Sequence, residues 1–134
     1  MATLADTNVL LDVATNDAQW ADWSLRALDD AALEGPIVIN PVIYAEFSVG
    51  YRRIEDVDRL LDATEIAVAE IPRAALFLAG KAFRRYRRKS GQKAGVLPDF
   101  FIGAHAAVAG MPLITRDKRK YRRYFPTVQI ISPI

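Results

Sequence analysis

Four acidic residues lie at places where their side chains could act together on a cation. Asp6 and Asp117 each follow a short apolar run, at the point where a strand would end. Glu46 and Asp99 lie in the first turns of helices that are expected to follow or flank strands. In an open parallel sheet the carboxyl ends of the strands share one edge, so the four carboxylates could meet in one pocket.

Carboxylates that are packed together need compensation, either from protons or from a cation. The chain contains no cysteine, and oxygen ligands alone select a hard cation such as Mg²⁺ or Mn²⁺. One or two such ions can polarise a phosphoryl oxygen and lower the pKa of a bound water. The pattern therefore indicates metal-assisted hydrolysis of a phosphodiester, although this chemistry does not choose between RNA and DNA.

Each acid also has a purely structural explanation. An aspartate after a strand is often only a helix N-cap, and Glu46 could simply favour its helix dipole. His105 is six positions beyond Asp99, about 240° around a helix, so we expect it to point away and to be structural. The polar neighbours that could orient the acids by hydrogen bonds, or could be ordinary turn residues, are Thr7, Asn8 and Thr115.

The net charge is only +2, but the two halves of the chain differ in sign. Residues 1–70 contain fourteen Asp and Glu against four Arg, whereas residues 71–134 contain fourteen Lys and Arg against two Asp. Two basic clusters, at 81–93 and 116–123, offer counter-charges to a polyanion, although either could be a solvated helix face. The expected RNA contacts are Arg84, Arg85, Arg87, Arg88, Lys89, Arg116 and Lys118. Base stacking stays open for three tyrosines in or beside these clusters, Tyr86, Tyr121 and Tyr124.

Short apolar segments alternate with amphipathic ones, which predicts an α/β fold with about five parallel strands covered on both faces. Strands are expected at 3–5, 37–39, 66–71, 112–114 and 128–131. Helices are expected at 8–13, 17–34, from Pro41, at 54–64, 72–89 and 97–109, and through Tyr121 and Tyr124. Residues 90–96 lack the lysine and hydroxyl of a phosphate-binding loop, so we expect a mobile loop there.

Three helices have an apolar stripe that predicts which face is buried. Residues 17–34 are expected to be capped by Asp17. The predicted inward residues are Trp20, Trp23, Ala27 and Ala31 for this helix, Ile54, Val57, Leu60 and Leu61 for the next, and Leu76, Ala79, Phe83 and Tyr86 for the third.

The composition is that of one ordinary globular domain spanning residues 1–134, with 51% hydrophobic and 25% charged residues. No apolar run reaches the length of a membrane span, and the N-terminus does not have the pattern of a secretory signal. Together with the lack of cysteine, this predicts a cytoplasmic protein with no membrane association.

The acids and their surroundings resemble a PIN-domain ribonuclease. The residues that carry the resemblance are Asp6-Thr7-Asn8, Glu46, Pro98-Asp99 before an alanine-rich helix, and Thr115-Arg116-Asp117 followed by Tyr121, Tyr124, Phe125 and Pro126. Within this superfamily the chain is similar, over its whole length, to the VapC-type toxins of bacterial and archaeal VapBC toxin–antitoxin modules.

The resemblance implies a three-layer α/β/α sandwich that forms a single PIN-like nuclease domain. It implies that Mg²⁺ or Mn²⁺, as one or two ions, is held by Asp6, Glu46, Asp99 and Asp117, and that the substrate is RNA. It also implies a homodimer, and inhibition by a cognate VapB-type antitoxin whose C-terminal segment wraps the toxin near its pocket.

Three other functions are weighed against a toxin. A magnesium-dependent phosphatase or phosphotransferase of the haloacid dehalogenase or receiver type is disfavoured, because Asn8 breaks the Asp-x-Asp pattern. A housekeeping PIN-like nuclease and a catalytically inactive RNA-binding module remain alternatives.

Overall fold

The computed structural model describes residues 1–90 and 96–133. Their five strands form one parallel sheet in the order β3-β2-β1-β4-β5, as the alternation of segments predicted. The strands are β1 Thr3–Ala5, β2 Ile37–Ile39, β3 Ala67–Val68, β4 Leu113–Ile114 and β5 Ile130–Ile131. The helices are α1 Thr7–Ala14, α2 Ala21–Glu34, α3 Pro41–Ser48, α4 Ile54–Ala63, α5 Arg73–Ser90, α6 Leu97–Ala109 and α7 Arg119–Arg122.

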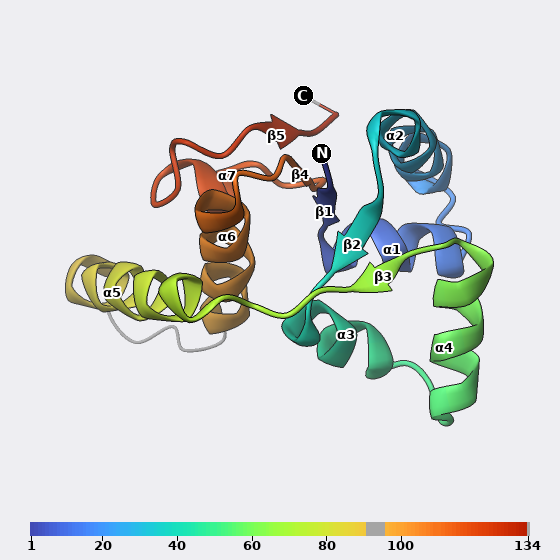
Figure 1. Cartoon of the computed structure of the whole chain (residues 1–134), viewed down its shortest axis with the longest axis horizontal. Coiled ribbons are helices and arrows are strands. Elements are labelled where there is room, and N and C mark those ends of the chain that lie inside the picture. Colours follow the sequence, from blue (N-terminus) through green and yellow to red (C-terminus); the bar gives the residue numbers. More distant parts are fainter. Residues whose placement is uncertain (91–95, 134) are drawn as a thin grey trace.

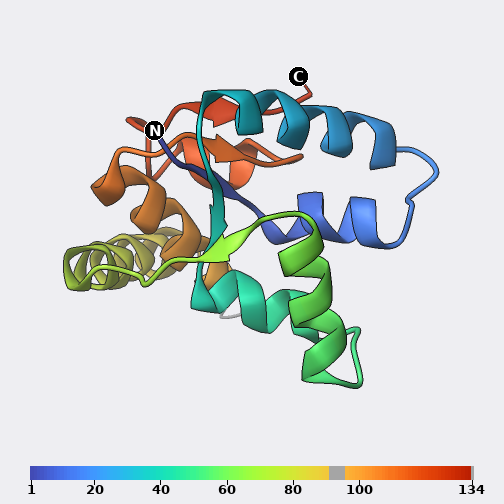
Figure 2. The same cartoon turned by 45° about the vertical axis from the view of Figure 1, so that its right-hand side comes forward.

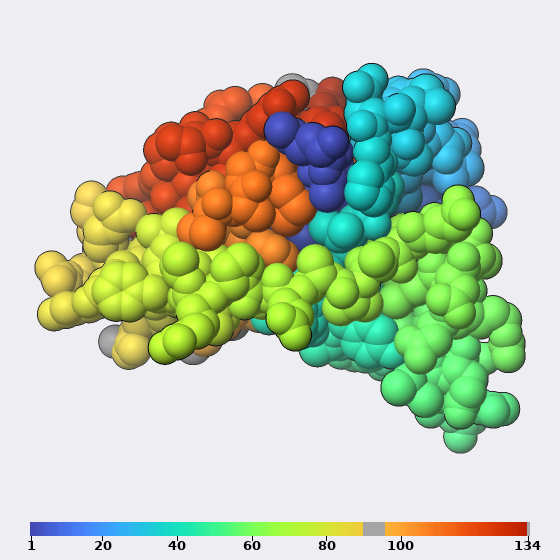
Figure 3. Space-filling view, in the orientation of Figure 1, coloured from blue at the N-terminus to red at the C-terminus, as the bar shows by residue number. Residues whose placement is uncertain are grey.

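The sheet separates two groups of helices, which makes the fold a three-layer α/β/α sandwich. Helices α1 to α4 lie on one side of the sheet and α5 and α6 on the other (Figures 1 and 2). In the space-filling view, α5 runs beside α6 along one end of the molecule and α4 protrudes at the other (Figure 3). Because β1 is central and its neighbours β2 and β4 come from different halves of the chain, strand order reverses beside β1. Ligands of open α/β sheets bind at this kind of position.

The inner strands carry the core. The residues of β1, β2 and β4 are buried, whereas both residues of β3 are exposed. β3 and β5 are shorter than the predicted 66–71 and 128–131, because an edge strand pairs on one side only and the apolar residues beside it can pack without joining the ladder.

The helix predictions are right in kind and wrong in several details. Asp17 Oδ1 accepts hydrogen bonds from the backbone N–H groups of Gln19 and Trp20, so it caps a turn that precedes α2 rather than α2 itself. In α4, Val57 and Leu61 are buried as predicted, but Ile54 at the helix start is 63% exposed.

The buried face of α5 also differs from the predicted one. Leu76 is 42% exposed, and the fully buried positions of α5 are Ala75, Ala79 and Ala82, which let α5 approach α6 closely. Ala79 was predicted on this face, and the predicted Phe83 and Tyr86 are half-buried, but small side chains at helical spacing allow tighter contact between two helices.

Gly103 of α6 makes room for Phe125, because a Cβ at this glycine would overlap the Phe125 ring. The segment after β4 can therefore lie against α6, which brings α7 toward the carboxyl edge of the sheet. The loop predicted at 90–96 falls largely outside the described residues. Among the helices of the described residues, none combines the length and apolar character needed to cross a membrane.

Candidate active site

Asp6 is the most deeply buried of the four predicted acids and lies directly after the central strand. It has extended backbone angles and begins α1 as its N-cap, with Oδ1 accepting a 2.7 Å hydrogen bond from Thr7 N. Oδ2 accepts from the hydroxyls of Thr115 at 2.8 Å and Tyr121 at 2.7 Å, and from Asn8 Nδ2 at 3.4 Å. A carboxylate that is 2% exposed would be costly without such donors.

Glu46 reaches the same edge from α3, and Thr7 links it to Asp6. The Thr7 hydroxyl donates to Glu46 Oε1 at 2.7 Å, while the Thr7 backbone N–H donates to Asp6. Asn40 Oδ1 accepts from Ile43 N and so caps α3, with Pro41 next, as the sequence indicated. Thr7 therefore orients two acids that are far apart in sequence.

Asp99 lies in the first turn of α6 and senses both of these carboxylates. Its side chain is 19% exposed, and burial raises its pKa from 3.8 to about 6. Lys120 opposes this with an ammonium group 3.7 Å from Oδ1, whereas the charges of Asp6 and Glu46 raise the pKa further. Three of the predicted acids are thus close enough for their charges to interact.

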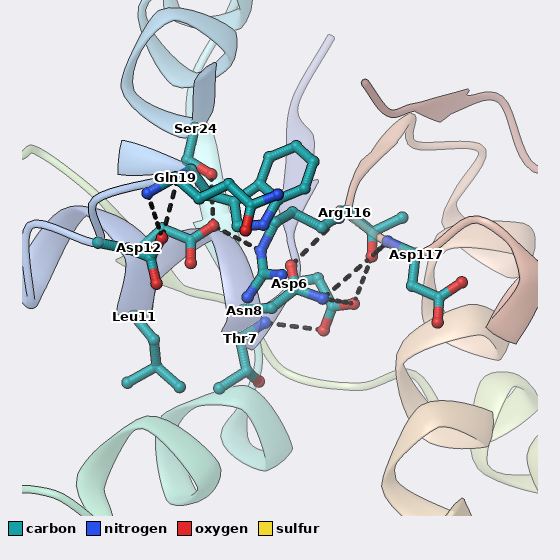
Figure 4. A network of polar contacts seen from close by, with 12 residues as sticks. Asp6, Thr7, Asn8, Leu11, Asp12, Gln19, Ser24, Arg116 and Asp117 are labelled. Carbon is teal, nitrogen blue, oxygen red and sulfur yellow. Dashed lines mark hydrogen bonds and ion pairs between the residues drawn. The ribbon is translucent and has the colours of Figure 1, made fainter. Parts of the chain in front are cut away.

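Asp117 follows β4 as predicted, but its carboxylate is engaged elsewhere. Oδ1 accepts from Arg119 N at 3.1 Å and lies 3.4 Å from Arg119 Nε. The backbone N–H of Asp117 donates to the Thr115 hydroxyl, so the main chain at this residue is tied to Asp6 through Thr115. In Figure 4 the Asp117 carboxylate lies apart from that of Asp6.

The four acids do not form a ready-made cation cage. Within residues 1–90 and 96–133, no group of three or more acidic or histidine side chains is arranged to hold a metal ion. In chemical kind, however, the residues fit a hard divalent cation: the donors are all carboxylate oxygens, and in the described part of the chain Asp6 Oδ1 accepts one hydrogen bond, from Thr7 N. The pKa of Asp99 is raised mainly by burial, and the charges of Asp6 and Glu46 add to this rise against the opposing charge of Lys120.

Arg116, predicted as an RNA contact, is held by a buried acid that the sequence did not single out. Its Nε lies 2.7 Å from Oδ2 of Asp12, which also accepts from Ser24, and its guanidinium lies 5.5 Å from the centre of the Trp20 ring (Figure 4). Asp12 is 2% exposed. Trp20 was expected on the buried face of 17–34. It is half-buried, and its ring covers the Arg116 guanidinium, which joins α1 to the loop after β4.

His105 is structural, as predicted from its helical position. It is 2% exposed, its Nδ1 lies 3.2 Å from Asn40 Nδ2, and burial lowers its pKa below 6.5. Since Asn40 Oδ1 is used by Ile43 N, the Asn40 amide group donates to Nδ1 and the imidazole is neutral.

Two further residues at the site became evident only from the structure. Tyr121 is fully buried, so it cannot stack on a base as the sequence left open; it donates to Asp6, and its own pKa is raised well above 10.0 by burial and by the nearby acids. Lys120 pairs with Asp99. The sequence pattern that could have indicated them is their position about one helical turn after Asp117. The same spacing is typical of an ordinary basic helix, so it did not single them out.

The predicted basic residues lie in two segments. Exposed positions in the last turns of α5 carry Arg84, Arg85, Arg87, Arg88 and Lys89. In the segment after β4, Arg116 and Lys118 line a hollow of about 680 Å³ together with Asn8, Trp20 and Asp117. Their contact with RNA stays a prediction.

The fold and the site define the class of protein. It is an α/β protein with an acidic site at the carboxyl end of the central strand, where the strand order of the parallel sheet reverses. The chain belongs to the PIN domain family, whose model matches residues 3–126. A search of curated proteins gives no match to the sequence.

Solved structures share the fold over almost the whole chain. A chain in VapBC2 from Rickettsia felis, bound to a DNA fragment from its promoter, has a TM-score of 0.75 at 18% identity, with 98% of both chains covered. VapBC-1 from nontypeable Haemophilus influenzae gives a TM-score of 0.72 at 17% identity, again with 98% of both chains covered. DNA-bound VapBC from Salmonella typhimurium gives 0.72 at 18% identity, with the same coverage. At these identities the likeness establishes the fold.

Proposed function

We propose that this chain is a Mg²⁺- or Mn²⁺-dependent endoribonuclease and the toxin of a type II toxin–antitoxin module. The observation that carries the proposal is the convergence of three buried or half-buried acids at one sheet edge: Thr7 bonds to Asp6 and Glu46, and the charges of these two carboxylates act on Asp99. The PIN domain match and the fold shared with chains of VapBC complexes support the toxin role.

Asp6, Glu46 and Asp99 would hold the cation, with Asp117 joining if its carboxylate leaves Arg119. A bound divalent ion would lower the pKa of a water molecule and neutralise charge that develops on the phosphodiester. The chain's own residues would prepare the site: Thr7 holds Glu46 and Asp6, and the hydroxyls of Thr115 and Tyr121 fix the other oxygen of Asp6.

The basic residues of the two segments would attract the RNA backbone, because phosphate contacts supply most of the sequence-independent affinity. Arg84, Arg85, Arg88 and Lys89 are exposed on α5 and can meet phosphates. The homodimer, the VapB-type antitoxin and the cytoplasmic location belong to the same proposal and follow from the family resemblance.

A catalytically inactive RNA-binding module is the second candidate, favoured by the lack of a preassembled ligand cluster in the described residues. One experiment separates the two. Purified protein is incubated with structured RNA in EDTA, in Mg²⁺ and in Mn²⁺, and the products are resolved by size. We expect cleavage only with metal, whereas binding without turnover under every condition would favour the module.

Glu46→Gln is the variant of choice for this assay, because it keeps the acceptor for Thr7 and removes the charge. The matched control is Asp62→Asn, the same carboxylate-to-amide change on the exposed face of α4. We expect Glu46→Gln to lose cleavage and growth inhibition in cells while Asp62→Asn retains both. Equal activity of Glu46→Gln and wild type would contradict the proposal.

A further inference from the structure

A pocket of about 250 Å³ opens beside Asp99, between α5, α6 and the residues of and around α7. Its aromatic wall is formed by Tyr86, Phe100 and Tyr124. Its cationic wall is formed by Arg119, Lys120 and Arg123. Pockets that take drug-sized ligands have volumes of about 300–1,000 Å³, so this one suits a single ring system.

Tyr124 has an unusual hydroxyl. In residues 1–90 and 96–133 it is the one buried side-chain nitrogen or oxygen that has no hydrogen-bond partner. The hydroxyls of Tyr44 and Tyr121, by contrast, donate to Asp58 and Asp6. A buried hydroxyl without a partner is costly, and native structures contain few of them. Tyr124 also lines the pocket, so a buried polar atom without a partner in the described residues belongs to a residue of the pocket wall.

The surroundings of Tyr124 are those that bind nucleobases. Its ring centre lies 5.3 Å from that of Phe100 and 6.1 Å from that of Tyr86. The guanidinium groups of Arg85 and Arg123 lie 5.9 and 5.6 Å from the Tyr124 ring centre. Aromatic rings and guanidinium planes are the surfaces on which unpaired RNA bases stack, while hydrogen bonds to the base edge supply the selectivity.

We infer that this pocket binds one unpaired base of the RNA substrate next to the scissile phosphate, and that the Tyr124 hydroxyl recognises this base by a hydrogen bond. The inference rests on the proposed nuclease function and names the part of the substrate that the site would select. The base lies beside the scissile bond because Asp99 belongs both to the acidic site and to the pocket wall. The cationic side chains of the pocket wall would bind the RNA phosphates next to this base.

Tyr124→Phe tests this role, because it removes the hydroxyl and keeps the ring. Since the hydroxyl has no partner within the described part of the chain, we expect the variant to fold and to unfold at a temperature equal to or above that of wild type. Tyr51→Phe is the matched control. Tyr51 is also half-buried at a surface pocket, but it lies between α3 and α4, and none of its neighbours there belongs to the acidic site.

The assay uses a pool of short single-stranded RNA with randomised sequence, cleaved in Mn²⁺, with both product ends sequenced. For wild type and Tyr51→Phe we expect enrichment of particular bases at a position adjoining the cut. In Tyr124→Phe we expect enrichment at this one position to fall about 2- to 10-fold, the loss typical of one neutral hydrogen bond, with other positions unchanged. Arg123→Gln should lower cleavage of all sequences alike, as a phosphate contact does.

A second measurement keeps the inference separate from the nuclease proposal. The affinities of oligo(A), oligo(C), oligo(G) and oligo(U) are measured by fluorescence anisotropy in EDTA, where no turnover is expected. If no RNA is cleaved but Tyr124→Phe narrows the affinity differences among the four, the nuclease proposal fails and the base pocket stands. If Tyr124→Phe and wild type show the same base preferences in cleavage and in binding, the inference is overturned. The pocket would then be a candidate site for a protein segment instead of a base.

Discussion

Replacing Asp99 with Asn should make the metal-free protein more stable while removing its proposed activity. The carboxylate of Asp99 is ionised at neutral pH in a half-buried place that already contains the charges of Asp6 and Glu46. An amide of the same shape carries no charge, so the variant avoids the repulsion and the cost of burial. Side chains arranged for catalysis are often costly to stability in this way.

The magnitude follows from the pKa of Asp99. The difference between the usual 3.8 and about 6 in the folded protein, at about 1.4 kcal/mol for each pKa unit, gives about 3 kcal/mol as an upper estimate. Between these two pH values the folded state binds more protons than the unfolded state, so the stability of wild type falls as the pH rises through this window. Asp99→Asn lacks this loss. Its advantage should therefore be full above pH 6 and should disappear as the pH falls toward 3.8.

Urea unfolding in EDTA at pH 7.5 and at pH 4.5 measures this difference directly. The matched control is Asp62→Asn on the exposed face of α4, which should change the free energy of unfolding little at either pH. Addition of Mn²⁺ at pH 7.5 should stabilise wild type and have less effect on Asp99→Asn, because a ligand of the ion has been removed. Equal stability of Asp99→Asn and wild type at pH 7.5, or an advantage that does not shrink at pH 4.5, would refute the reasoning.

Two further predictions concern the residues that hold the site in place. Asp12→Ala leaves the Arg116 guanidinium without its buried partner and should lower the free energy of unfolding by about 3 kcal/mol. The control is Asp56→Ala, in the exposed pair with Arg59, which should lower it by about 1 kcal/mol or less. Similar losses for the two variants in urea unfolding would show that the Asp12 pair contributes no more than a surface pair. His105 is the one histidine of the chain, so an NMR titration of its ring reports one unambiguous pKa, which should lie below 6.5 because the buried ring is held neutral by Asn40. As the pH falls from 6.5 toward that lower value, the unfolded state takes up the proton first and stability declines; a measured pKa at or above 6.5 would contradict the buried, neutral assignment.

The fold class and the placement of the acids after strands or in the first turns of helices could be predicted from local patterns. Short apolar runs such as Ile37 to Ile39, each followed by a turn and an amphipathic helix, require crossovers and therefore a parallel sheet. The same rule places Asp6 at the carboxyl end of the central strand. His105 was assigned correctly because helical geometry alone sets its direction relative to Asp99.

Other features depend on which elements meet, and no local pattern carries that information. Ala75, Ala79 and Ala82 became the buried face of α5 because α6 packs there, although Leu76 is more hydrophobic. Tyr121 and Asp6 are 115 residues apart, and their hydrogen bond forms only when the segment after β4 packs beside the end of β1.

The sequence by itself therefore determined the type and order of the elements and the kinds of side chain available to the site, because these depend on short-range periodicity and on the chemistry of each residue. Only the tertiary structure decided which partners each acid has and how strongly the acids interact. It turned Asp117 toward Arg119, set Lys120 beside Asp99, and left the Tyr124 hydroxyl without a partner among residues 1–90 and 96–133. Burial and distance control each of these interactions, and both are properties of the packed chain rather than of any segment of it.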